Sequence, residues 1–127
     1  MCALYTKGLL KTSLYYSFEG IPYAESVSGE FRFMPPIPKE PWPYILDATQ
    51  DGPVCPQLNA FGFLSVNEEY ACGNAGIKDV LLSLKWINKN LKYFGGDSRK
   101  ITIGGHSSGG TLAHYLMLSK KTSGLFQ

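Results

Sequence analysis

Residues 104–111 (GGHSSGGT) decide the fold of this chain, because they hold a serine between glycines within a strongly patterned region. Three interpretations of this stretch imply different chemistry. A phosphate-binding loop requires a lysine directly before Thr111, and Gly110 stands there instead. A purely structural turn requires only small residues. A nucleophile elbow requires a strand before the serine and a helix after it.

The flanks of the glycine stretch favour the elbow. The apolar run Ile101-Thr102-Ile103 predicts a buried strand, and residues 111–118 (TLAHYLML) predict a helix. A longer amphipathic helix is predicted over residues 76–94, ending at Gly95-Gly96, because apolar residues recur there at steps of three and four. These residues are Ile77, Val80, Leu84, Ile87, Leu91 and Phe94. The order helix, strand, glycine turn, helix is typical of an α/β fold with a parallel sheet.

In the elbow interpretation, five consecutive residues carry the site: Gly105, His106, Ser107, Ser108 and Gly109. Ser107 is the candidate nucleophile, because an elbow lifts the serine hydroxyl clear of the sheet, and we expect positive φ at this residue. The backbone N–H of Ser108 is the candidate donor to an oxyanion. Gly105 and Gly109 supply the small neighbours that a tight turn needs. His106 is either a substrate contact or a residue of the turn.

The first part of the chain has a different composition. All eight prolines lie between Pro22 and Pro56, with aromatic residues among them. This pattern predicts short strands and turns rather than helix. A disordered proline-rich linker is the alternative, and the aromatic content argues against it.

Length, charge and cysteine spacing limit the functional classes. A chain of 127 residues is enough for one domain, and a net charge of +2 gives no indication of a nucleic-acid partner. No apolar run is long enough to span a membrane, and the first twenty residues do not resemble a secretory signal. Cys2, Cys55 and Cys72 have no metal-ligand spacing, so we expect no metal and no cofactor. These features together predict a reducing, cytoplasmic setting.

Taken together, these residues resemble the type-B carboxylesterases of the α/β-hydrolase fold, and among them the insect α-esterases. The resemblance rests on the elbow and on six other stretches: residues 18–24 (FEGIPYA), 29–33 (GEFRF) with Pro35 or Pro36, 52–57 (GPVCPQ), 58–65 (LNAFGFLS), 73–79 (GNAGIKD) and 94–97 (FGGD). It implies a partial α/β-hydrolase fold, with an N-terminal β-hairpin region followed by the strand, elbow and helix of the central sheet. It also implies a serine esterase that acts on small carboxylic esters through an acyl-enzyme.

The resemblance also indicates how the chain is organised. Residues 1–127 form one partial carboxylesterase domain, in which residues 15–57 are the hairpin and proline-rich segment and residues 58–127 the elbow segment. The family has a long stretch between these segments, with a His-Gly-Gly loop that serves the oxyanion hole. Here Gln57 is joined directly to Leu58, and no His-Gly-Gly occurs. We therefore expect an internal deletion at this join.

The family's triad acid and histidine would follow the elbow, and we find neither. His114 lies about 10 Å along the helix axis from Ser107, so we expect it to pack within the fold rather than to act as a base. Asp79 and Asp97 are expected to be structural, the latter as a cap. No triad acid or base is assigned, and we predict that the chain as it stands is inactive. The alternative is a non-catalytic pseudoenzyme or binding module.

Overall fold

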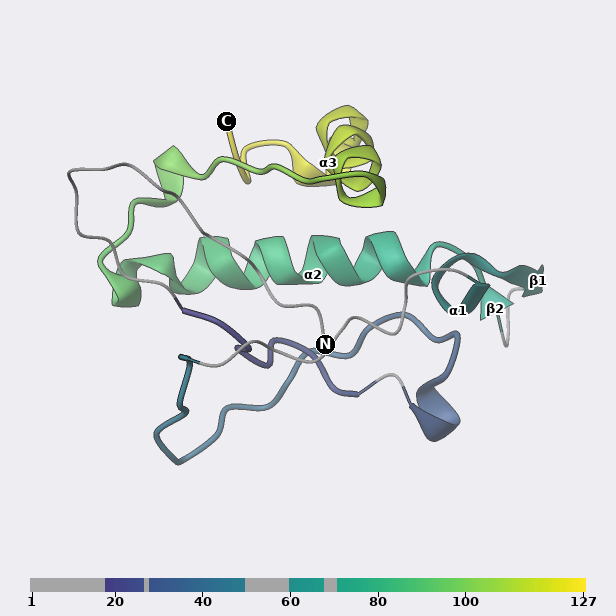
Figure 1. Cartoon of the computed structure of the whole chain (residues 1–127), viewed down its shortest axis with the longest axis horizontal. Helices are drawn as coiled ribbons and strands as arrows, with labels where there is room; N and C mark the ends of the chain where they lie inside the picture. Colours follow the sequence, from purple (N-terminus) through teal and green to yellow (C-terminus); the bar gives the residue numbers. More distant parts are fainter. Residues whose placement is uncertain (1–17, 27, 50–59, 68–70) are drawn as a thin grey trace.

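The computed structural model describes residues 18–26, 28–49, 60–67 and 71–127. Its elements follow in the order η1 (Gly29–Phe31), α1 (Ala60–Phe63), β1 (Ser65–Asn67), β2 (Ala71–Cys72), α2 (Ala75–Asn90), η2 (Leu91–Phe94), η3 (Ser98–Lys100), α3 (Ser108–Leu118) and η4 (Lys120–Thr122), where η is a 3₁₀ turn. Helix α2 runs through the middle of the molecule. Residues 18–49 lie along one side of it, and α3 with the C-terminal residues lies along the other (Figure 1).

Helix α2 confirms the predicted helix. It is preceded by Asn74 in the left-handed conformation, and the 3₁₀ turn η2 prolongs it to Gly95, whose φ of 77° ends the helix. The buried face is not the predicted apolar stripe, since only Leu84 of that stripe is buried and Phe94 is 37% exposed. The residues that are buried along α2 are otherwise small or polar: Ala75, Gly76, Asp79 and Ser83.

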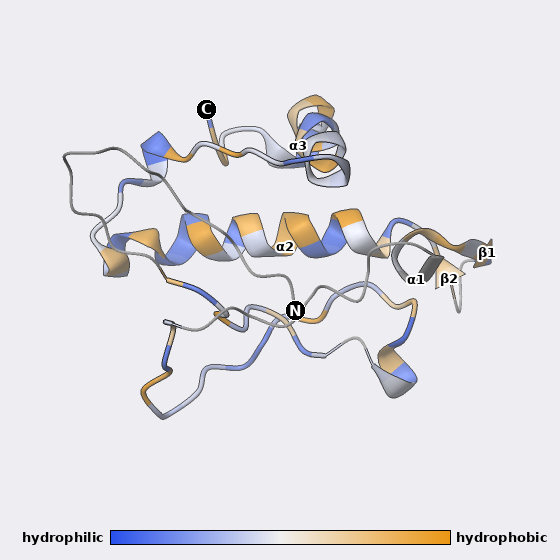
Figure 2. Cartoon of the chain, in the orientation of Figure 1, coloured by the Kyte–Doolittle hydropathy of each residue, from blue (hydrophilic) through white to orange (hydrophobic). Residues whose placement is uncertain are grey.

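This difference has a physical reason in the arrangement of α2. The N-terminal segment approaches α2 from one side, and the chain that leads into α3, with α3 itself, approaches it from the other, whereas a sheet would cover one broad face (Figure 2). The apolar residues of α2 therefore lie partly on each side, and most of them are half-buried.

Strand pairing is sparse in the described part of the chain. Strands β1 and β2 form a two-stranded antiparallel sheet. The N-terminal segment pairs with itself at a single antiparallel bridge between Ala24 and Pro38. Backbone bonds flank that bridge, from Glu25 N to the Ile37 oxygen at 2.9 Å and from Lys39 N to the Tyr23 oxygen at 3.0 Å. The prediction of turns and short extended pieces without helix is confirmed here, apart from the one turn of η1.

The prediction of a buried strand at Ile101-Thr102-Ile103 is wrong for this chain. Ile101 is extended and buried, but Thr102 is exposed and no strand is formed there. The backbone oxygen of Ile101 accepts a bond from the N–H of Gln127, at 2.9 Å. A parallel strand exists only where neighbouring strands accept and donate its ladder bonds, and the described residues contain no such neighbour.

The apolar core of the described residues is small. Its buried members are Tyr23, Ala24, Ala71, Ala75, Leu84, Ile101 and Leu116. On α3, by contrast, Tyr115, Met117 and Leu118 are 53%, 65% and 70% exposed. The outer face of α3 is therefore not covered by any described residue. None of the described helices is both long and apolar enough to cross a membrane.

Candidate active site

The turn before α3 has the backbone geometry of an elbow. Ser107 precedes Ser108–Leu118 as the N-cap residue, with φ 55° and ψ −122°. A residue with a Cβ rarely adopts positive φ, and this conformation costs about 1–3 kcal/mol. The predicted positive φ at a turn that leads into a helix is confirmed. This backbone points the serine side chain outward, and the residue is exposed.

Glycine is required at position 105 by close contact between two backbones. A Cβ placed on Gly105 would overlap the carbonyl group of Gly109 and would lie 2.6 Å from the nitrogen of Gly110. The chain entering the turn therefore crosses the first turn of α3 with no room for a side chain. Gly109 differs, because a Cβ there would meet nothing within 4 Å. The two glycines of the motif thus have different roles in this chain.

Local hydrogen bonds hold the turn in place. The N–H of Gly109 donates to the oxygen of His106 at 3.0 Å, and the N–H of Thr111 donates to the oxygen of Ser107 at 3.2 Å. Ser108 is the first residue of α3, so its N–H has no acceptor within the helix and lies at the positive end of the helix dipole. That N–H remains available to an anion beside the serine.

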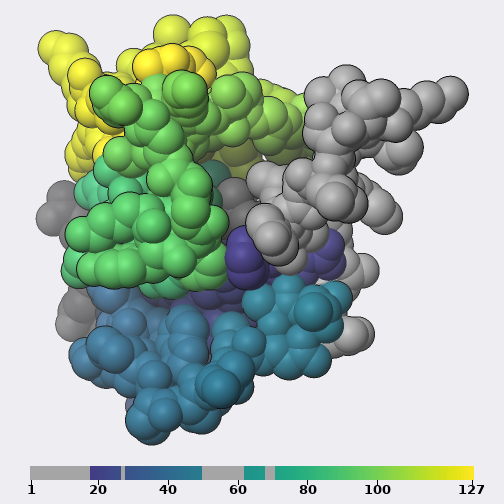
Figure 3. Space-filling model, turned by 90° about the vertical axis from the view of Figure 1, so that its left-hand side faces the viewer, coloured from purple at the N-terminus to yellow at the C-terminus, as the bar shows by residue number. Residues whose placement is uncertain are grey.

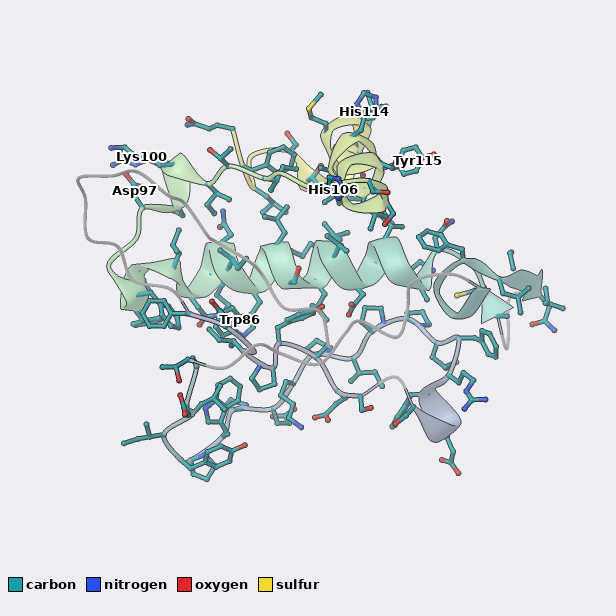
Figure 4. The ribbon with its side chains drawn as sticks, viewed as in Figure 1. Trp86, Asp97, Lys100, His106, His114 and Tyr115 are labelled. Carbon is teal, nitrogen blue, oxygen red and sulfur yellow. The ribbon has the colours of Figure 1, made fainter. Side chains whose placement is uncertain are left out.

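Neither histidine is placed as a base for Ser107. Both His106 and His114 are exposed, and the described residues show no hydrogen bond from the Ser107 hydroxyl to either ring. Figure 4 shows His106 beside the turn and His114 projecting from the side of α3 that faces away from α2. The expectation that His114 packs within the fold is therefore wrong. It is exposed because no described element covers that side of α3.

Asp97 and Asp79 have structural roles, as expected, and no described contact joins either of them to Ser107. Asp97 caps η3 by accepting from the N–H of Arg99 at 3.0 Å, and it also pairs with the Arg99 guanidinium. These bonds to Arg99 lower the pKa of Asp97. Two further acids that precede the elbow in the sequence, Glu68 and Glu69, lie outside the described residues.

Asp79 is buried at the contact between α2 and the N-terminal segment. The Tyr23 hydroxyl donates to its Oδ2 at 2.8 Å, and both residues are at most 3% exposed. Burial raises the pKa of Asp79, and the bond from Tyr23 opposes that rise. Sequence analysis missed this pair, which joins positions 56 apart. Asp79 does not belong to the predicted apolar stripe, so the sequence carried no signal that its carboxylate is buried and needs a donor.

Two concave regions of the described chain lie away from Ser107. One lies between the N-terminal segment and α2 with η2, the other is lined by residues within 117–126 after α3, and the elbow contributes to neither. No three metal-binding side chains gather among the described residues. The local elbow is therefore formed, neither of these two concave regions adjoins it, and no described base or acid is bonded to Ser107.

Comparison with known proteins accounts for this combination. A sequence model of the carboxylesterase family matches residues 6–60 and 57–127. The juvenile hormone esterase of Heliothis virescens is 31% identical over 190 residues, covering 87% of this chain and 34% of that protein. Venom carboxylesterase-6 of Apis mellifera is 30% identical over 195 residues, covering 97% of this chain and 35% of that protein.

Solved structures agree with the sequence comparison. The crystal structure of juvenile hormone esterase from Manduca sexta, with OTFP covalently attached, aligns with a TM-score of 0.77 at 29% identity. The alignment covers 86% of this chain and 34% of that one, so the chain spans about one third of the length of these relatives. The predicted partial α/β-hydrolase fold and the resemblance to insect esterases are confirmed.

Proposed function

Because the chain belongs to the carboxylesterase family, we propose that Ser107 is the nucleophile of a carboxylic-ester hydrolase. The observation that carries this proposal is the strained backbone of Ser107, at φ 55° directly before α3. Backbone strain lowers the stability of the fold. A strained conformation at a polar side chain therefore points to a functional use of its geometry. The covalent attachment of OTFP to the Manduca sexta relative is consistent with a nucleophile in this fold.

The chemistry of the proposal is acyl transfer. The oxygen of Ser107 attacks the ester carbonyl, and a base takes the hydroxyl proton. The carbonyl oxygen gains the negative charge, and the N–H of Ser108 donates to it at the N-terminus of α3. The alcohol leaves with a proton, and water then hydrolyses the acyl-serine to release the acid. Small carboxylic esters are the corresponding substrate class.

We propose that residues 1–127 alone do not complete this reaction. His114 lies two helical turns beyond Ser107, and a base must come within about 3 Å of the serine oxygen. Losing the histidine of a triad costs on the order of 10⁶ in turnover, and losing one oxyanion donor about 10²–10³. Either loss alone slows the reaction severely, and the loss of the histidine has the larger effect.

We further propose that the chain lacks an internal stretch of the family fold at the join of Gln57 and Leu58. Two findings support this. The family model matches in two pieces that meet at residues 57–60. The alignment to the Heliothis virescens esterase spans 190 residues, more than the 127 of this chain, so that relative has residues with no counterpart here. The oxyanion loop of the family falls in this stretch.

A non-catalytic binding module is the second candidate function. It is favoured by the absence of a base or an acid near Ser107 among the described residues. The retained serine and its strained turn favour the hydrolase, because a binding module has no use for either.

The test compares two proteins with p-nitrophenyl acetate as the substrate. One is the chain itself, and the other is a chimaera in which residues 58–127 replace the matching segment of the Heliothis virescens esterase. We expect no serine-dependent hydrolysis by the chain. We expect hydrolysis by the chimaera, reduced by on the order of 10⁶ in Ser107→Ala. Ser108→Ala is the matched control, since alanine keeps the backbone N–H, and it should retain activity.

Two results would contradict these proposals. An active chimaera that keeps its activity in Ser107→Ala would show that Ser107 is not the nucleophile. Hydrolysis by the chain itself that is lost in Ser107→Ala would show that residues 1–127 contain a base, and His106→Gln would then be the first variant to examine.

A further inference from the structure

An apolar pocket lies on the opposite side of α2 from the elbow. One wall comes from the N-terminal segment, through Phe18, Ile21 and Tyr23, and the other comes from α2 and η2, with a volume of about 140 Å³. Figure 4 shows Trp86 projecting from α2 toward the N-terminal segment, whereas His106 lies on the side of α3. The pocket is therefore separate from the proposed nucleophile.

Ring contacts shape the open end of this pocket. Phe18 packs edge-on against Phe94, with 4.8 Å between ring centres, and Trp86 lies 6.0 Å from Phe94. Both phenylalanines are partly exposed, at 39% and 37%, so they form the rim. Figure 3 shows residues of the N-terminal segment, in purple, seated between the green residues that follow α2 and the blue residues 30–49.

The inner wall is apolar, and its one hydroxyl is already bonded. Tyr23 is 2% exposed, and its hydroxyl donates to Asp79 at 2.8 Å. Ile87 and Leu91 complete the wall on the helix side. Water at the inner end of the pocket would find few polar partners on the lining, and a buried water ordinarily makes about three hydrogen bonds. The inner end therefore favours an apolar occupant over water.

We propose that this pocket binds a small apolar molecule of the size of one aromatic ring. An enclosed protein cavity of about 150 Å³ lined by aliphatic and aromatic side chains takes benzene, and this pocket has a similar volume and lining although one end is open. Edge-to-face contacts with Phe18, Phe94 and Trp86 suit a flat ring. The occupant fastens the N-terminal segment to α2, because it contacts both walls.

Binding is tested with toluene as the ligand and the fluorescence of Trp86 as the signal, in a Trp42→Phe background that leaves Trp86 as the remaining tryptophan. We expect saturable binding of one toluene per chain, confirmed by titration calorimetry. We also expect toluene to raise the temperature of thermal unfolding by an amount that grows with the logarithm of its concentration once the pocket is saturated, since it binds the folded state.

Two variants fill the pocket from opposite walls, namely Ile87→Phe and Ile21→Phe. Each is expected to weaken toluene binding by at least about tenfold, which corresponds to about 1.4 kcal/mol. Leu82→Phe is the matched control, because it makes the same increase in size on α2 at a residue that does not line the pocket. It should keep the affinity within about twofold. Circular dichroism checks that each variant keeps its helices, and having two filling variants protects the test against misfolding of one.

The proposal is overturned by any of three results. The first is an absence of saturable toluene binding. The second is equal weakening by Leu82→Phe and Ile87→Phe. The third is binding of the larger dye 8-anilinonaphthalene-1-sulfonate in competition with toluene and at equal affinity in all variants, since this would indicate general exposure of apolar surface.

Discussion

The elbow turn and the N-terminal segment depend on different parts of the chain. In the elbow, the partners that shape Ser107 lie within a few positions of it: Gly105, Gly109 and Gly110. The N-terminal segment reaches α2 through a bond between Tyr23 and Asp79, which are 56 positions apart. The elbow is formed although no described strand lies beside it, whereas the described part of the N-terminal segment contains a single bridge, between Ala24 and Pro38. The turn at Ser107 is therefore formed because it depends on contacts within a few residues, whereas strand pairing needs partners from distant parts of the chain.

The largest expected effect tests the steric part of the elbow. Gly105→Ala should destabilise the folded chain by about 3 kcal/mol, because its Cβ overlaps backbone atoms that cannot rotate away. Gly109→Ala is the matched control and should be neutral or slightly stabilising, since it adds a methyl group in open space at the start of a helix. Urea unfolding followed by circular dichroism measures both. Equal losses in the two variants would show that the elbow is not closely packed.

The contact over 56 positions is tested by removing its donor. Tyr23→Phe should cost about 1–3 kcal/mol, because the buried carboxyl group of Asp79 then lacks that hydrogen bond. Tyr93→Phe serves as the control, since Tyr93 is 75% exposed and its substitution should change stability little. Limited proteolysis reports whether the loss is local to residues 18–49. A Tyr23→Phe chain as stable as the Tyr93→Phe chain would mean that the bond contributes nothing to docking.

Strain at Ser107 is tested by two variants that both remove the hydroxyl. Ser107→Gly should be more stable than Ser107→Ala by about 1 kcal/mol. Glycine adopts positive φ without strain because it has no Cβ, whereas the Cβ of alanine keeps the strain. The measurement is the difference in urea midpoint at equal slope. If the Ser107→Ala chain were as stable as the Ser107→Gly chain, the turn would not be strained, and strain would no longer support a functional role for Ser107.

The smallest expected effect concerns pH. Burial raises the pKa of Asp79, so the folded chain binds this proton more tightly than the unfolded chain. The stabilisation that this proton gives to the folded chain is therefore fully present below the unfolded pKa of 3.8, and it is lost as the pH rises through the folded pKa. Asp47 and Asp97 have lowered pKa values and act in the opposite direction, so the comparison needs a reference chain.

That reference is Asp79→Asn, which keeps an oxygen to accept from Tyr23. Between neutral pH and pH 4, the unmodified chain should gain stability relative to Asp79→Asn as the pH falls. Urea unfolding at a series of pH values gives the difference. A difference that stays constant or changes in the other direction would show that Asp79 remains charged at the contact.

Much of the local structure could be predicted from the residues alone. The periodicity of residues 76–94 predicts α2 with η2, and Gly95 ends that helix as expected. Asp97 caps the next turn, and the glycines around Ser107 predict its positive φ. Each of these depends on steric and hydrogen-bonding preferences that act within a few residues, so the signal for each lies in the sequence beside it.

The features that were predicted wrongly depend on distant partners. The apolar run Ile101-Thr102-Ile103 has the composition of a parallel strand, but it lacks paired neighbours in the described chain. His114 was expected to pack and is exposed, because the element that would cover its side of α3 is not among the described residues.

By itself, the sequence determined the family, the position of the candidate nucleophile and the conformation of the turn that presents it. These follow from residue identities and short-range sterics, which do not depend on the rest of the fold. Only the tertiary structure decided which α2 positions are buried, that Tyr23 donates to Asp79, and that an apolar pocket forms between the N-terminal segment and α2. The physical reason is that burial and hydrogen bonding each require a partner segment. When that partner is distant in the sequence, only the folded structure shows which residues it covers.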